Sequence, residues 1–206
     1  MRAFLLTVCV FLIVGCSQHK AEPKPPAQQP QEAATNAIGV LQKLVNEQNY
    51  KSLGFQSLDE VKQAQLGQPM EVFNIGLDKI KSYQAGEDPN QLLTASAETI
   101  YPVTVSNAVR TGVTIVHKER GYEPSSFGNA DIVKRLSAYR QTTADFVARI
   151  PAFNMYFIGR HVDTRVVLVP IVSDPRLKVQ AGEATPLEVV IDQLRPYVNA
   201  YNGLPM

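Results

Sequence analysis

The start of the chain limits which residues can belong to its fold. After Met1 and Arg2 comes an almost wholly apolar run, Ala3 to Val14, which ends at Gly15 and Cys16. A helix that crosses a bilayer needs about 20 apolar residues, so this run is too short to span one. Its length is typical of the apolar part of a signal peptide, which is removed from the mature protein. We therefore expect the fold to be built from the residues after Cys16.

The end of the run, Ile13-Val14-Gly15-Cys16, resembles the lipobox of bacterial lipoproteins. The resemblance implies that the Cys16 thiol receives a diacylglycerol, that the chain is cut before Cys16, and that the new amino terminus is acylated. Two or more acyl chains anchor a protein stably in a membrane. In Gram-negative lipoproteins an Asp after the lipidated cysteine favours the inner membrane, so Ser17 indicates the outer membrane, with the domain facing the periplasm. The alternative is an ordinary secretory signal that ends at a cysteine by chance.

The cysteines and the net charge exclude several classes of function. Of the two cysteines, Cys9 would leave with the signal peptide and Cys16 would carry lipid. The mature chain is therefore expected to lack a thiol for a disulfide, for redox chemistry or for a zinc site. The net charge is +1, without the basic field that nucleic-acid-binding proteins use. We expect no nucleic-acid partner.

Residues 17–34, SQHKAEPKPPAQQPQEAA, contain four prolines and no large apolar side chain. They have nothing to bury, so we expect a disordered tether with polyproline II character. At about 3.1 Å per residue, such a tether could hold a domain up to roughly 55 Å from the membrane. Proline-rich segments also serve as ligands for aromatic grooves, but a spacer is the interpretation that we favour. The chain then divides into a signal peptide (1–15), a lipidated cysteine with its tether (16–34) and one globular domain (35–206).

Apolar residues at helical spacing predict several helices in the domain. The first would run from about Thr35 to Gln48. Ser57-Leu58-Asp59-Glu60 is a capping box, which opens a short helix ending near Gly67. A second capping box, Thr185-Pro186-Leu187-Glu188, opens the last helix, which Pro196 should kink or end. The other helical segments that we expect are Leu77–Tyr83, Gln91–Ala95 and Ala130–Arg140.

Segments rich in Val, Ile and Thr predict the strands. Ile100–Ser106 and Val109–His117 should form a hairpin around Asn107-Ala108. Phe146–Ile158 and Arg165–Val172 should form a second hairpin. The further strands that we expect are Met70–Gly76 and Tyr122–Phe127.

The order of these elements indicates the fold class. Mixed runs of strands and helices are typical of the α+β class. We expect an antiparallel sheet built largely from two hairpins, with helices packed on one face of it. Val166–Ile171 is apolar at every position, which is typical of a central strand that is covered on both faces.

The sequence carries no recognisable catalytic signature. It contains no H-E-x-x-H, G-x-S-x-G, P-loop or G-x-G-x-x-G motif. We therefore predict no catalytic residue, no metal site and no cofactor. The aromatic side chains of Phe153, Tyr156 and Phe157 are interpreted as part of the core rather than as a platform for a ligand.

One cluster of charged residues is a candidate binding loop. Arg160, His161 and Asp163 lie in the predicted connection of the second hairpin, residues 159–164, and Arg165 begins the strand that follows it. Hairpin tips are exposed. Two arginines beside a His and an Asp could bind a carboxylate or a phosphate through paired hydrogen bonds. The alternative is a charged loop that only keeps the turn soluble.

Three functions are compatible with this sequence. The one that we favour is a non-enzymatic envelope lipoprotein that binds a protein partner, with sheet edges that could accept a strand. The second is a periplasmic sensor or carrier of a small ligand or peptide, which requires a closed apolar pocket of several hundred Å³. The third is an envelope hydrolase, which requires a pocket that gathers His161, Asp163 and a further acid.

Overall fold

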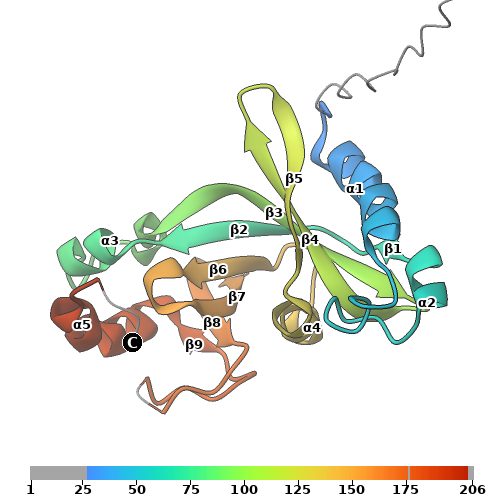
Figure 1. Cartoon of the computed structure of the whole chain (residues 1–206). Helices are drawn as coiled ribbons and strands as arrows, with labels where there is room; N and C mark the ends of the chain where they lie inside the picture. Colours follow the sequence, from blue (N-terminus) through green and yellow to red (C-terminus); the bar gives the residue numbers. More distant parts are fainter. Residues whose placement is uncertain (1–26, 176, 204–206) are drawn as a thin grey trace, which may run out of the picture.

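The structure is a computed structural model that describes residues 27–175 and 177–203 (Figure 1). These residues form five α-helices, nine strands and two short 3-10 helices. In chain order they are α1 (Pro30–Leu44), α2 (Leu58–Lys62), β1 (Gln65–Leu66), β2 (Met70–Ile75), α3 (Leu77–Ser82), the 3-10 helix η1 (Pro89–Leu92), β3 (Leu93–Val105), β4 (Ala108–Lys118), β5 (Gly121–Gly128), α4 (Ala130–Tyr139), β6 (Phe146–Ile150), the 3-10 helix η2 (Pro151–Phe153), β7 (Met155–Val162), β8 (Arg165–Pro170), β9 (Thr185–Pro186) and α5 (Leu187–Ala200).

The strands form one sheet in the order β5-β4-β3-β2-β6-β7-β8-β9, and β1 pairs with β3 beside β2. Neighbouring strands are antiparallel, with the exception of the parallel pair β2 and β6. The fold is therefore a mixed α and β fold with a mostly antiparallel sheet, and the predicted class is confirmed at that level.

Helices cover both faces of the sheet, so the prediction of a single covered face is wrong. Successive residues of a strand point to opposite faces. On β6, Val147 packs in an apolar cluster with Leu136 of α4, whereas Ala148 packs in another cluster with Ile191 of α5. On β3, Tyr101 belongs to a third cluster, which lies under α1. The strands are apolar at successive positions, and both faces therefore need a cover.

Several elements lie where the sequence predicts them. The strands β2, β4 and β5 and the helices α3 and α4 are each confirmed to within about two residues at either end, the usual uncertainty of such boundaries. The β3–β4 hairpin also forms, but its turn is Ser106-Asn107, one residue earlier than predicted. These two residues have φ values of 49° and 65°, as a tight hairpin turn requires at both central positions. In the capping box before α2, the backbone N–H of Glu60 donates to Ser57 Oγ.

The second predicted hairpin is wrong in its detail. Phe146–Ile158 is not one strand but two, β6 and β7, which pair with each other around η2 and Asn154. Pro151 has no N–H to donate to a ladder, and Asn154 adopts a left-handed φ of 51°, so the chain turns back there. The predicted loop over residues 159–164 is largely part of β7, and the β7–β8 turn is only Asp163-Thr164.

Other differences concern the ends of helices. α1 begins at Pro30, and Ala33 and Ala34, which we assigned to the tether, are buried against the sheet. The predicted helix over Gln91–Ala95 is wrong, because η1 ends at Leu92 and the chain continues as β3.

The last helix also departs from the prediction. Thr185 does not cap α5, because it pairs with β8 as part of β9. Pro196 lies inside α5, which continues to Ala200. β8 is next to the last strand of the sheet rather than central.

Part of each sheet edge is covered. At one edge, the backbone N–H of Tyr122 in β5 donates to the carbonyl oxygen of Ala27 at 2.8 Å. Pro124, which has no N–H, follows on the same strand beside a register shift. At the other edge β9 covers part of β8, and the N–H of Gly182 donates to the carbonyl oxygen of Pro170 at 2.9 Å. Natural sheets use such features against strand addition, and they leave less of each edge free to accept a partner strand.

Candidate functional site

The predicted binding loop does not form one cluster. Arg160 and His161 are successive residues of β7 and therefore point to opposite faces of the sheet. Asp163 lies in the exposed turn with a φ of 53°, and Arg165 begins β8 with an exposed side chain. The four residues are close in the sequence, but the fold does not direct them to a common point.

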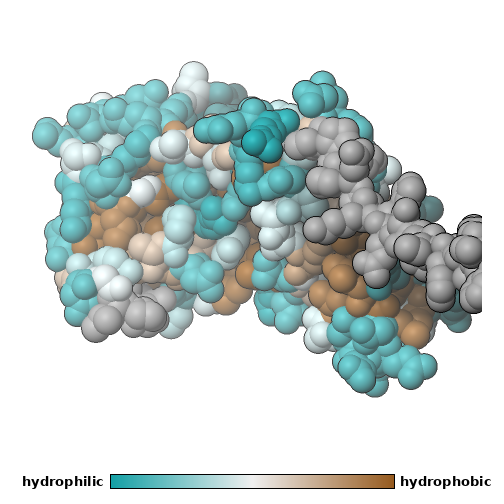
Figure 2. Space-filling view, turned by 45° about the horizontal axis from the view of Figure 1, so that its top comes forward, coloured by the Kyte–Doolittle hydropathy of each residue, from teal (hydrophilic) through white to brown (hydrophobic). Residues whose placement is uncertain are grey.

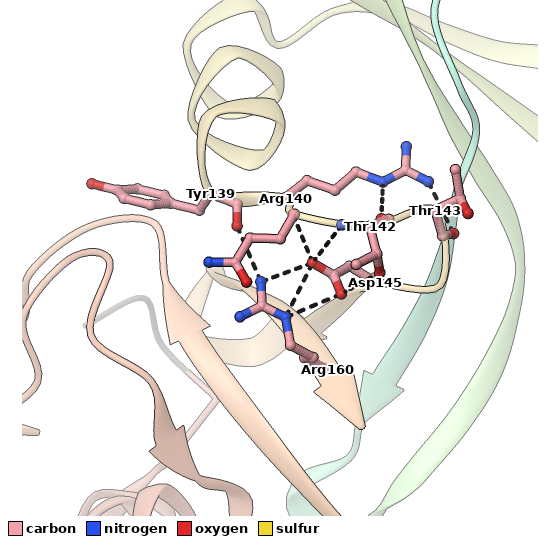
Figure 3. Close-up of polar contacts among 7 residues, drawn as sticks. Tyr139, Arg140, Thr142, Thr143, Asp145 and Arg160 are labelled. Atoms are coloured by element: carbon pink, nitrogen blue, oxygen red, sulfur yellow. Dashed lines mark hydrogen bonds and ion pairs between the residues drawn. The ribbon is translucent and has the colours of Figure 1, made fainter. Parts of the chain in front are cut away.

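Arg160 is held by a carboxylate inside the fold (Figure 3). Its Nε donates to Asp145 Oδ1 at 3.1 Å, and its Nη2 donates to Asp145 Oδ2 at 2.8 Å. Nη2 also lies 3.4 Å from the backbone carbonyl oxygen of Tyr139, at the end of α4. Arg160 could have offered such paired hydrogen bonds to a ligand, but here the acceptor belongs to the same chain.

Asp145 is 3% exposed and accepts further hydrogen bonds. The N–H of Gln141 donates to its Oδ2 at 2.8 Å, and the Thr142 hydroxyl donates to its Oδ1 at 2.9 Å. Burial alone would raise the pKa of this carboxyl, but the hydrogen bonds from Arg160, Gln141 and Thr142 outweigh it and lower the pKa to about 2. Asp145 is therefore ionised at neutral pH, and the same pairing raises the pKa of Arg160.

Arg140 completes this polar cluster. Its guanidinium donates to the carbonyl oxygens of Thr142 and Gln68 at 2.9 Å each, and to that of Thr143 at 3.1 Å. Burial lowers the pKa of Arg140, while the charge of Asp145 raises it. Together the two arginines bind the connection over residues 140–145, between α4 and β6, to β7 and to Gln68, two residues before β2. Their contacts fix the fold, and none of these contacts requires a ligand.

His161 has a surface position. Its ring lies 5.6 Å from the ring of Phe146, at an angle of 44°, and the residue is exposed. In the part of the chain that the structure describes, no three His, Cys, Asp or Glu side chains are grouped closely enough to hold a metal ion.

A groove lies at the other end of β7 and β8. It has a volume of about 280 Å³ and lies between α4, the β6–β7 turn and the segment that follows β8. Most of the side chains that line it are apolar. They include Ile132, Phe153, Met155, Tyr156, Ile171 and Val172.

The groove exists because two chain reversals meet α4. η2 and Asn154 turn the chain between β6 and β7. After β8 the chain leaves the sheet, and the isolated pairing of Asp174 with Val179 folds it back. Val172, on the rim, is 56% exposed, so apolar surface continues from the groove onto its rim.

A small polar pocket of about 80 Å³ adjoins this groove and shares Ile132 and Tyr156 with it. In the pocket, Arg149 Nη2 lies 2.8 Å from Glu98 Oε2. The Nε of Arg149 also donates to Asn74 Oδ1 at 3.0 Å. The side chains of this ion pair are 23% and 29% exposed, so polar groups of a ligand could reach them. The groove and the pocket together form a candidate site with an apolar part and a polar part.

Exposed apolar side chains also occur elsewhere on the molecule. Val40 and Leu44 on α1 are 44% and 55% exposed, and Val189 on α5 is 40% exposed. Figure 2 shows apolar surface in two areas, one at the end that carries α3 and α5 and one at the end that carries α1 and α2. The exposed valines away from the groove provide matched controls for Val172.

Comparison of the chain with models of known protein families, with curated proteins and with solved structures finds no match in any of the three. Cys16, and with it the predicted lipid anchor, lies outside the described residues. Within residues 27–175 and 177–203, no helix is long and apolar enough to cross a bilayer.

Sequence reasoning missed the groove. Its residues come from three separate segments, so no spacing in the sequence connects them. The one local signal was the aromatic set, which we assigned to the core. Phe157 is buried as expected, whereas Phe153 and Tyr156 are half-buried and line the groove.

Proposed function

We propose that this protein is a non-enzymatic lipoprotein of the cell envelope, anchored in the outer membrane through Cys16. Its domain faces the periplasm and binds a segment of a partner protein in the groove beside α4. The lipobox resemblance supports the anchor, and the groove supports the binding role.

The observation that carries the binding role is the apolar groove with Val172 on its rim, 56% exposed. A volume of 280 Å³ lies just below the range of about 300–1,000 Å³ in which pockets enclose a drug-sized molecule. It suits one or two apolar side chains of a polypeptide, whose remaining residues would lie across the surface. Burying each such side chain would contribute about 1.5–3 kcal/mol.

A carrier of a small ligand or free peptide is the alternative. The adjoining pair of Arg149 and Glu98 favours it, because both charges could orient a small zwitterionic molecule. The open groove disfavours it, because a carrier is expected to enclose its ligand. For a hydrolase, His161 and Asp163 would have to converge with a further acid, and both lie at the exposed β7–β8 end.

The binding role is tested by crosslinking in cells and recovery of the full-length lipidated protein through a C-terminal tag. We expect one stoichiometric envelope partner, which is lost in Val172→Asp and retained in Val40→Asp and Val189→Asp. All three positions are exposed, so none of these changes should unfold the domain. If the partner is still recovered with Val172→Asp but is lost with Arg165→Ala, the binding site is the predicted loop and not the groove. Absence of any specific partner would contradict the protein-binding role and lead to thermal-shift screening of small ligands.

The anchor is tested separately by mass spectrometry of the amino-terminal peptide. The proposal predicts a mature chain that begins at an acylated Cys16, and a Cys16→Ser variant that no longer fractionates with the outer membrane. An unmodified Cys16 thiol in the mature protein would contradict it.

A further inference from the structure

The segment before α1 is attached to the edge of the sheet. Ala27 pairs with Tyr122 of β5 in an isolated antiparallel bridge, and the Tyr122 N–H donates to the Ala27 carbonyl oxygen at 2.8 Å. Ala27 is 7% exposed and belongs to the apolar cluster under α1. The chain is therefore fixed to the domain from Ala27 onward, eight residues before the predicted start of the fold.

The attachment point is next to the tip of the β4–β5 hairpin. Tyr122 is opposite His117, and their rings stack with centroids 4.5 Å apart. The next pair, Lys118 with Gly121, closes the hairpin. Figure 1 shows this hairpin projecting from the rest of the sheet on the side where the chain enters α1.

The groove is at the other end of the molecule. In Figure 1, α4 and the connection between β8 and β9 lie at the bottom, whereas the β4–β5 tip lies at the top. The groove and the tip of the hairpin are therefore on different sides of the domain.

The attachment also limits how far the domain can move from its anchor. Eleven residues separate Cys16 from Ala27 in the sequence. A chain spans at most about 3.6 Å per residue, so this distance cannot exceed about 40 Å. The limit is shorter than the roughly 55 Å expected if the tether extended to Ala34.

We infer that the lipid-anchored protein has a preferred orientation, with the β4–β5 tip toward the bilayer surface and the groove facing away from it. The inference rests on the proposed function, because it requires lipid on Cys16. The tip is charged rather than apolar, so it would lie at the level of the lipid headgroups and would not enter the hydrocarbon.

The charges at the tip nearly cancel. Lys118 forms an ion pair with Glu123, and Glu119 and Arg120 have opposite charges. An anionic surface would therefore attract the tip only weakly, since such attraction is worth about 1 kcal/mol per uncompensated basic residue. The attachment of Ala27, and not the charge of the lipids, sets the orientation.

The test uses energy transfer from the domain to lipid headgroups. The mature chain should have no free thiol, so Glu119→Cys and Val172→Cys each introduce one site for a fluorophore. Full-length lipidated protein is placed in phosphatidylcholine vesicles that contain a headgroup-labelled acceptor lipid. We expect transfer from position 119 to be several-fold more efficient than from position 172, and unchanged when a third of the lipid is phosphatidylglycerol.

A matched pair of variants tests the cause of the orientation. Ala27→Asp places a charge at the buried attachment point, whereas Gln28→Asp places the same charge at the exposed neighbouring residue. Ala27→Asp should reduce the difference between positions 119 and 172, and Gln28→Asp should leave it unchanged.

Equal transfer from the two positions, or more efficient transfer from 172, would overturn the inference. A preference for 119 that appears only with phosphatidylglycerol would also overturn it, because charge would then set the orientation. Failure of the proposed anchor is a distinguishable result, since the protein would not float with the vesicles at all.

Discussion

The two ends of the β7–β8 pair differ in the side chains that they carry and in what those side chains contact. At the turn end the sequence is rich in charge, but Arg160 is bound to Asp145 and His161 lies on the opposite face. At the other end the sequence is apolar, and the chain reversals around η2 and after β8 meet α4 to form a groove. Charged residues that are neighbours in the sequence need not act together, and an apolar groove can form where the sequence carries no charged motif.

The Arg160–Asp145 pair at the turn end should have the largest effect on stability. Asp145→Asn leaves the guanidinium of Arg160, 19% exposed, without its counter-charge. Removing one partner of a buried ion pair costs about 3–5 kcal/mol, and we expect about 3 kcal/mol because Arg160 is partly hydrated. The free energy of unfolding in urea measures this effect.

Asp59→Asn is the matched control for that change. Asp59 is paired with Lys62 at 2.9 Å, but the two side chains are 80% and 77% exposed. Surface pairs of this kind contribute about 0–1 kcal/mol, so the control should be close to the unmodified protein. Equal effects of the two substitutions would show that Asp145 has no special role in the fold.

The same pair predicts how stability depends on pH. The pKa of Asp145 is about 2 in the folded protein, below its ordinary value of 3.8. The stabilisation is therefore fully present above about pH 5 and is lost as the pH falls through 2, with a total loss of about 2.5 kcal/mol below that pH. Urea unfolding at a series of pH values should show this loss, and Asp145→Asn should lack it. An unchanged slope in the variant would assign the acid sensitivity to other carboxyls.

Gly159, in the middle of β7, separates the two ends. A methyl group at this position would overlap the ring of Phe146, so Gly159→Ala should destabilise the domain by about 1–3 kcal/mol. Gly39 in α1 has no atom within 4 Å of the corresponding position. Gly39→Ala should therefore leave thermal stability unchanged or raise it by about 0.5–1 kcal/mol. A Gly159→Ala variant as stable as Gly39→Ala would contradict the tight packing of Phe146.

The smallest effects on stability are expected from the exposed residues at each end. His161→Ala and Val172→Asp should each change the free energy of unfolding by less than about 0.5 kcal/mol. The two variants should differ in partner recovery, which only Val172→Asp should abolish. Loss of the partner in His161→Ala alone would reverse the roles that we assign to the two ends.

The sequence predicts the local elements of this fold better than their assembly. The β3–β4 hairpin and α4 have clear periodicity and end signals, and both are found. The turn at η2 had a local signal in Pro151, but an apolar run on both sides of it made Phe146–Ile158 resemble a single strand. The Ala27–Tyr122 bridge joins residues that are far apart in the sequence, and no local preference of Ala27 could indicate it.

The same limit applies to the candidate site. A cluster such as Arg160 with Arg165 is visible in a sequence because its members are neighbours. Whether such side chains are available to a ligand depends on distant residues. Arg160 is not, because its guanidinium donates to Asp145, fifteen positions earlier in the sequence. The groove depends wholly on tertiary contacts, since Ile132 of α4 lines it together with residues from the ends of β7 and β8.

We propose that the apolar end of the β7–β8 pair, and not its charged turn, contacts a partner. The most direct test is to place a photo-crosslinking amino acid in living cells at Val172 or at Val162, which are 56% and 47% exposed. We predict a crosslink to a single envelope protein from position 172 and none to that protein from position 162. A crosslink from position 162 but not from 172 would contradict the account and restore the charged turn as the binding site.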